Sequence, residues 1–323
     1  MRALATALSL HKPASRQLGA AALILLASGL CHLLVLVAVN GQWAGPISLR
    51  KPITFGFSMG MLIWTLGWVI DRLPSRPRLE AWLGYALAGS GLLEVALITV
   101  QAWRGVPSHF NYTTVQDLVV FVFMGTSIAV LSAGLLVTTG WAVARPPSPP
   151  AVGLAVRAGL VLAVTGLGIG QWMIELGNDF VEQFDRGPDQ VLAGDAGTPT
   201  FPHALAFHGI QVFILAAIVP GLLGLSARAA QRIVRLVVSG YSLLLLWSIV
   251  QAATGRAPLD PHGPETALAV VGIGCCVAAA AQLLVGYRAT RTSSTADPDP
   301  RDADPAVVGR AVADRETVVP SAL

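Results

Sequence analysis

The apolar residues of this chain form eight continuous runs of about twenty residues each, separated by short polar segments. The runs are rich in Leu, Val and Ala, without the strict alternation that marks the strands of a membrane barrel. A helix of that length crosses a hydrocarbon core of ~30 Å and satisfies its own backbone hydrogen bonds. The pattern therefore predicts an all-α integral membrane protein whose eight transmembrane helices cover residues 17–39, 53–70, 81–103, 117–144, 152–175, 203–225, 233–253 and 266–287.

Only 12% of the residues are charged, so the placement of the cations is informative. Basic residues concentrate in every second connection, which the positive-inside rule assigns to the cytoplasm. Both termini are then cytoplasmic, the main polar loops are extracytoplasmic, and the expected location is a bacterial-type plasma membrane. Because the cations lie between spans rather than on one soluble face, we expect the lipid bilayer, and no nucleic acid, as a partner. The cations on the cytoplasmic side are Arg2, Lys12, Arg16, Arg72, Arg76, Arg78, Arg145, Arg228, Arg232, Arg235, Arg288 and Arg291.

The segments outside the apolar runs suggest how the chain is divided. A proline-rich link at 146–151 falls at the midpoint, and the Asp-, Pro- and Ala-rich C-terminal segment has the composition of a disordered chain. The predicted parts are a cytoplasmic start (1–16), a first four-helix half (17–145), the link (146–151), a second half (152–288) with an acidic outer loop (176–202), and a cytoplasmic tail (289–323).

The two halves show a weak internal similarity. An offset of 150 residues aligns Pro52 with Pro202, Phe57 with Phe207, Gln101 with Gln251 and Gly105 with Gly255. A second match, between residues 41–43 and 170–172, has an offset of 129. Four spans that start inside, followed by four more, predict two halves in a parallel pseudo-repeat about an axis along the membrane normal.

The stretch from Gln101 to Asp117 carries polar and aromatic chemistry between two apolar runs. Arg104 and Gly105 resemble a turn after a helix end, and residues 111–114 resemble the cap of the next helix. Within the stretch, Arg104 and His109 are candidate catalytic residues, whereas Gln101 and Asn111 are candidate substrate-binding residues. The alternative is a loop with a purely structural role.

Other candidate site residues lie in or beside the spans. Glu94 is an ionisable residue at membrane depth, which is a site hypothesis by default, although a neutral acid bonded to a neighbouring helix is an alternative. Arg50 and Lys51 precede a helix, where they would attract an anion or anchor the helix at the interface. Gln211 shares a helix face with His208 and is a further candidate for substrate binding.

His32 and His208 are the best-placed histidine pair for the axial ligands of a haem b, since imidazole nitrogen is a common haem ligand. The arrangement of eight spans in two four-span halves resembles the architecture of haem A synthase. This resemblance concerns architecture alone, so it carries over no residues. It implies a haem-binding or other redox membrane protein.

Two further function classes remain open on these residues. In a proton-coupled transporter or ligand-binding protein, Arg104, Arg50 and Lys51 would attract a small anionic solute and Glu94 would exchange a proton. In an enzyme that acts on lipids, Glu94, His109 or His208 would be acid and base while Arg104 binds phosphate. We identify no metal-binding motif, and whether the protein is an enzyme stays open.

Overall fold

The computed structural model describes residues 2–45 and 47–295 of the chain. The regular elements of this part are all helices, and eight of its nine helices are long and apolar enough to span a membrane. The prediction of an all-α membrane protein with eight spans is confirmed. The helices are α1 (Arg2–Leu8), α2 (Pro13–Ala38), α3 (Arg50–Arg72), α4 (Pro77–Trp103), α5 (Val115–Ala144), α6 (Pro150–Phe184), α7 (Thr200–Leu222), α8 (Ala227–Ala253) and α9 (Thr266–Thr295).

Most helices begin and end within a few residues of the predicted spans, and the differences have sequence reasons. Helix α6 continues to Phe184, because the amphipathic segment after residue 175 extends the same helix beyond the apolar run. Helix α9 continues to Thr295, so residues 289–295 of the predicted tail are helical. Residues 296–323 lie outside the described chain. The short helix α1 occupies the predicted cytoplasmic start.

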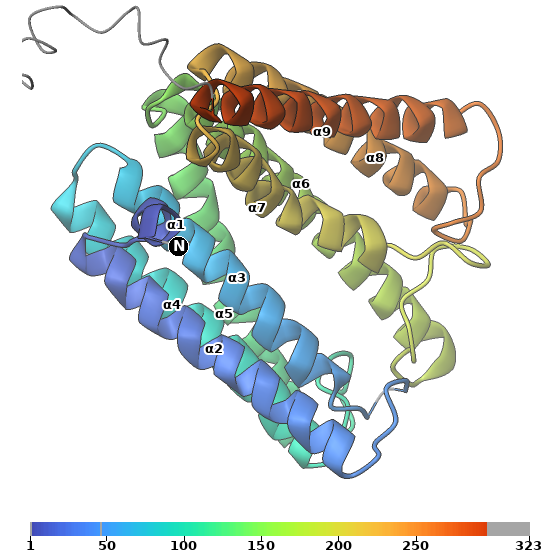
Figure 1. The fold of residues 1–323 in the computed structure, drawn as a ribbon. Coiled ribbons are helices and arrows are strands. Elements are labelled where there is room, and N and C mark those ends of the chain that lie inside the picture. Colours follow the sequence, from blue (N-terminus) through green and yellow to red (C-terminus); the bar gives the residue numbers. More distant parts are fainter. Residues whose placement is uncertain (1, 46, 296–323) are drawn as a thin grey trace, which may run out of the picture.

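The long helices form two groups, α2–α5 and α6–α9, which pack mainly within themselves (Figure 1). In each group the first helix packs on the second and third, the second on the third, and the third on the fourth. The first pair is close in both groups. Gly29 of α2 faces residues 56–57 of α3, and Gly166 of α6 faces residues 206–207 of α7, at distances where an added Cβ would crowd its neighbours. Contacts between the groups are fewer and run mainly from α5 to α6, α3 to α7 and α1 to α7.

One proposed alignment of the halves does not pair equivalent positions. Residues 41–43 follow the end of α2, whereas residues 170–172 lie inside α6. The close packing of Gly29 and Gly166 gives a different alignment for the first helix of each group.

A polar network fixes α1 and the start of α2 at the predicted cytoplasmic end. The Asp71 carboxylate accepts hydrogen bonds from the backbone N–H groups of His11 and Lys12, at 2.7 and 2.8 Å, and from the Ser15 hydroxyl at 2.6 Å. The Lys12 ammonium lies 2.9 Å from the Glu80 carboxylate. Because buried charges are costly unless they are paired, these contacts stabilise one arrangement of α2, α3 and α4. Helix α1 is attached to α3 by the Trp68 indole, which donates to the Ala7 carbonyl at 2.9 Å.

Candidate functional site

The end of α4 is closed by a glycine in the left-handed conformation. Gly105 has φ of 69°, the N–H of Val106 donates to the Gln101 carbonyl at 3.1 Å, and the N–H of Gly105 donates to the Ala102 carbonyl at 3.2 Å. This pattern is a Schellman cap, which satisfies the last carbonyls of a helix. The predicted turn at Arg104 and Gly105 is therefore confirmed.

Helix α8 ends in the same way. Gly255 has φ of 73°, the N–H of Arg256 donates to the Gln251 carbonyl at 2.9 Å, and the N–H of Gly255 donates to the Ala252 carbonyl at 3.1 Å. In both halves, the helix-end glutamine is fully buried. The matched residues at the 150-residue offset thus share a backbone role.

Two polar side chains at the end of α4 and one at the start of α5 meet at Asp117. The fully buried Gln101 amide donates to Asp117 Oδ1 at 3.0 Å, and Arg104 Nη1 donates to the same oxygen at 2.8 Å and also to Gln101 Oε1. Thr114, the N-cap of α5, donates from its hydroxyl to Asp117 Oδ2 at 2.7 Å. The hydrogen bonds of Gln101 and Arg104 therefore join the end of α4 to the start of α5 and close the α4–α5 hairpin.

In the rest of the central loop, Asn111 closes a local turn, and its neighbours Phe110 and Tyr112 contact α6 of the second half. The Asn111 amide donates to the Pro107 carbonyl at 3.1 Å, which closes a local turn. The next residue, Tyr112, donates from its hydroxyl to Asn178 Oδ1 of α6 at 3.1 Å. Burial raises the pKa of Tyr112, so its phenol is a neutral donor. Phe110 packs so closely on Gly177 that no side chain would fit there.

His109 lies in an aromatic pocket above the start of α3. Its ring centroid is 5.9 Å from that of Phe55 and 6.4 Å from that of Phe121, and its Nδ1 is 2.9 Å from the Ser108 hydroxyl. Burial lowers the pKa of His109 to about 3, and the nearby charge of Lys51 acts in the same direction. The imidazole is therefore neutral at physiological pH.

Arg50 and Lys51, at the start of α3, differ from the other partly buried cations of the described chain because no carboxylate lies beside them. Both are partly buried, yet within the described chain neither side chain has a hydrogen bond or a carboxylate beside it. The other partly buried cations of the described chain each lie beside a carboxylate: Lys12 beside Glu80, Arg72 beside Asp71 and Arg256 beside Glu265. The cost of desolvating Lys51 is thus not offset by an internal anion.

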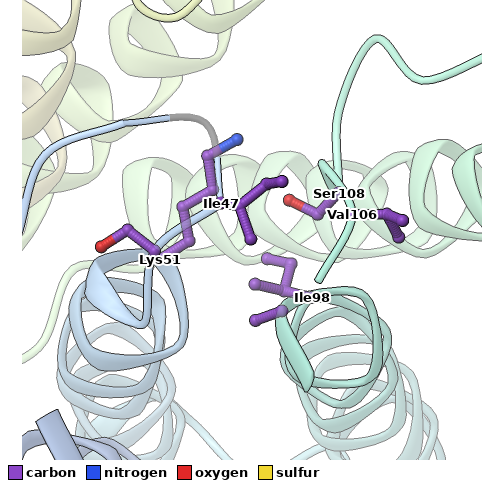
Figure 2. A pocket seen from close by; sticks show the side chains of 7 residues that line it. Ile47, Lys51, Ile98, Val106 and Ser108 are labelled. Atoms are coloured by element: carbon purple, nitrogen blue, oxygen red, sulfur yellow. The ribbon is translucent and has the colours of Figure 1, made fainter. Parts of the chain in front are cut away.

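A small cavity of about 10 Å³ lies beside Lys51. Figure 2 shows Lys51 from α3, Ser108 from the α4–α5 loop and Ile98 from α4 around it. A volume of this size admits about one water-sized group. The complete lining is Ile47, Ser48, Lys51, Ile98, Ala102, Val106 and Ser108.

Glu94 lies one helical turn below Ile98 on the same face of α4 and is only 1% exposed. The Ser127 hydroxyl of α5 lies 2.6 Å from Glu94 Oε2. Glu94 therefore faces Ser127 of α5. Along α4 it lies farther than Ile98 of the cavity wall from the ion pair of Arg104 and Asp117.

The proposed haem ligands have different neighbours. His32 Nδ1 is 2.7 Å from the Ser28 carbonyl and its Nε2 accepts from the Trp103 indole at 3.0 Å, so both ring nitrogens are engaged. His208 is on α7, where Gln211 forms a 3.1 Å hydrogen bond with Thr65 of α3. Pairing of the two imidazoles on a haem stays a prediction. Within residues 2–45 and 47–295, no group of three or more His, Cys, Asp or Glu side chains gathers as a metal site.

The sequence reasoning missed two partners that organise the site, Asp117 and Ser127. A signal for Asp117 was present, because Thr114 and Asp117 have the spacing of an N-cap residue and its acidic third position. Ser127 carried no local signal, since its contact with Glu94 depends on how α4 and α5 pack. Comparisons of the chain with protein-family models, curated proteins and solved structures give no match.

Proposed function

We propose that this membrane protein binds a small anion, or the anionic group of a larger solute, at the start of α3. The observation that carries the proposal is the partly buried Lys51, with Arg50 next to it, which has no anionic partner in the described chain. Every other cation buried to a similar extent there is paired. An anion from solution would supply the negative charge that the described chain does not place beside Lys51.

The surroundings of Lys51 suit an oxyanion. The cavity admits one group of water size, which corresponds to a single oxygen of a carboxylate or phosphoryl group, with the rest of the solute outside. The positive end of the α3 helix dipole adds to the field of Arg50 and Lys51. Since the positive-inside rule assigns this end to the outside, the solute would arrive from the extracytoplasmic side.

His109 lies beside this site, since it contacts Ser108 of the cavity wall and is close to Lys51. When the Ser108 hydroxyl donates to Nδ1, the ring proton resides on Nε2 and can be donated to a bound oxyanion. A neutral imidazole next to Lys51 avoids like-charge repulsion, which a protonated one would add. Arg104, in contrast, contributes to this site only by holding the loop, because it is paired with Asp117.

The chain offers a sharp test, because Lys12 and Lys51 are its only lysines. Protein in nanodiscs would be treated with an amine-acetylating reagent, in the presence or absence of phosphate, sulfate, acetate or succinate, and the modified peptides quantified by mass spectrometry. We expect at least one of these anions to protect Lys51. Lys12 is the internal control, because its ammonium is bonded to Glu80 and to the carbonyls of Ile70 and Leu73.

The affinity for the protecting anion would then be measured by calorimetry in matched variants. Lys51→Gln should weaken binding by about tenfold to a hundredfold, as expected for the loss of a charge-assisted hydrogen bond. Arg186→Gln removes an exposed charge at the same end and should change the affinity less than twofold, on the order of a surface charge effect. The proposal fails if no anion of the panel protects Lys51, or if both variants bind equally well.

A further inference from the structure

A second, larger hollow lies at the opposite end of the first half, between α1, α2 and α3. Its volume is about 510 Å³, and its walls include Leu8, Leu10, Gly19, Leu23 and Trp64. Gly19 allows Leu10 to pack directly on α2 in this wall, since an added Cβ there would lie 2.7 Å from the end of Leu10. The surface is thus an apolar groove on one side of a membrane span.

The position of the groove determines what can fill it. Gly19 and Leu23 belong to α2, whose apolar span lies in the hydrocarbon region, and Leu23 is exposed to the surroundings of the helix bundle. At that depth no bulk water is present, so the apolar material in contact with the groove is the acyl chains of lipids.

One cation borders this apolar groove. Arg16 lines it and is exposed, and its Nε donates to the Leu10 carbonyl at 3.4 Å. Within the described chain, the terminal nitrogens of Arg16 have no hydrogen bond and no carboxylate partner. The nearby Asp71 is already bonded to His11, Lys12 and Ser15. The planar guanidinium therefore remains available for a phosphate at the level of the lipid headgroups.

We propose that this groove binds an anionic phospholipid, with the headgroup phosphate on Arg16 and one acyl chain along Gly19, Leu23 and Trp64. The positively charged rim and the apolar floor match the two parts of such a lipid. This site lies at the end of the bundle opposite Lys51, so the proposal is independent of anion binding there.

Trp64 allows the occupancy to be measured by fluorescence. The full chain would be reconstituted in phosphatidylcholine vesicles with increasing fractions of either brominated phosphatidylglycerol or brominated phosphatidylcholine, since bromine quenches nearby indoles. Subtracting the signal of Trp64→Phe isolates the contribution of Trp64 from the other tryptophans. We expect half-maximal quenching of Trp64 at a fraction of brominated phosphatidylglycerol about fivefold below that of the zwitterionic lipid, the preference that one arginine provides near a membrane surface.

Three variants separate the parts of the site. Arg16→Gln should remove the preference for phosphatidylglycerol while leaving quenching by both lipids. Gly19→Leu should fill the groove and abolish the quenching of Trp64, and its fold should persist because the Leu10 side chain can move aside. Arg228→Gln removes an exposed cation of the same end on α8 and should retain the preference. Equal quenching of wild type by both lipids, no quenching of Trp64, or equal loss in Arg16→Gln and Arg228→Gln would each overturn the proposal.

Discussion

Arg104 Nη1 lies 2.8 Å from the Asp117 carboxylate and thereby ties the end of α4 to the start of α5. At the corresponding place in the second half, Arg256 is paired with Glu265 just before α9. Both arginines follow a buried glutamine and lie next to a glycine with positive φ. The two long hairpins are thus closed by the same device, although Arg104 precedes its glycine and Arg256 follows its glycine.

Removing this ion pair should loosen the α4–α5 hairpin. Arg104→Gln leaves the nearly buried Asp117 with Gln101 and Thr114 as its partners, so we expect the free energy of unfolding to fall by about 1–2 kcal/mol. Denaturant unfolding in detergent micelles measures the change. Arg186 is exposed and forms no ion pair within the described residues, so Arg186→Gln should stay within about 0.5 kcal/mol of wild type. Equal stability of both variants would show that the pair contributes nothing.

The fold could be predicted from the sequence because it depends on run length and polarity, which are local properties. The eight spans and the cap at Gly105 follow from patterns within a few residues, whereas residues 176–184, assigned to the outer loop, extend α6. The network at Asp71 could not be predicted, since its partners His11 and Lys12 lie about sixty residues away along the chain.

The candidate site was predictable only in part, for the same reason. Lys51 and His109 were named from the sequence and lie near each other in the structure. Arg104 remains a predicted catalytic residue, and its pairing with Asp117 could not be predicted because a paired and an unpaired arginine look alike in a sequence. The pairing of His32 with His208 stays a prediction, and the hydrogen bond from the Trp103 indole to His32 is a long-range contact that the sequence alone does not indicate.

The contact between the two halves at the central loop should be sensitive to a single methyl group. A Cβ at Gly177 would lie 2.1 Å from the Phe110 ring, so Gly177→Ala should displace the loop and lower the free energy of unfolding by about 1–3 kcal/mol. Gly168→Ala is the matched control on α6, because a Cβ there meets nothing within 4 Å. It should leave stability unchanged or raise it by about 1 kcal/mol through helix propensity. Similar losses in both variants would contradict close packing at Gly177.

His109 should make the loop sensitive to acid. Its pKa is lowered to about 3 in the folded protein, against an ordinary value near 6.5 once the loop opens and the ring is solvated. Opening then takes up a proton between these values, so the closed loop is fully stabilised above pH 6.5 and loses stability progressively as the pH falls toward 3.

Hydrogen exchange of the 106–112 backbone amides as a function of pH measures this opening. After correction for the intrinsic exchange rates, protection in wild type should fall by up to about tenfold per pH unit below pH 6. His109→Gln cannot titrate and should show a flatter profile. A wild-type imidazole that titrates near its ordinary pKa in NMR spectra would contradict the prediction.

Glu94 should carry a proton at neutral pH because of the hydrogen-bond count at Ser127. The Ser127 hydroxyl lies 2.6 Å from Glu94 Oε2 and 2.8 Å from the Met124 carbonyl, yet it has one hydrogen for two acceptors. A protonated Glu94 resolves the conflict, since the carboxyl then donates to Ser127 and the serine donates to Met124.

Infrared spectra should contain a protonated-carboxyl band at pH 7 that disappears in Glu94→Gln. The amide of that variant can still donate to Ser127, so its stability should change by less than about 1 kcal/mol, whereas Ser127→Ala should lower stability by about 1–3 kcal/mol by leaving the carboxyl without this partner. An infrared spectrum that is the same in wild type and Glu94→Gln would mean that the carboxylate is ionised and that Ser127 alone donates to it.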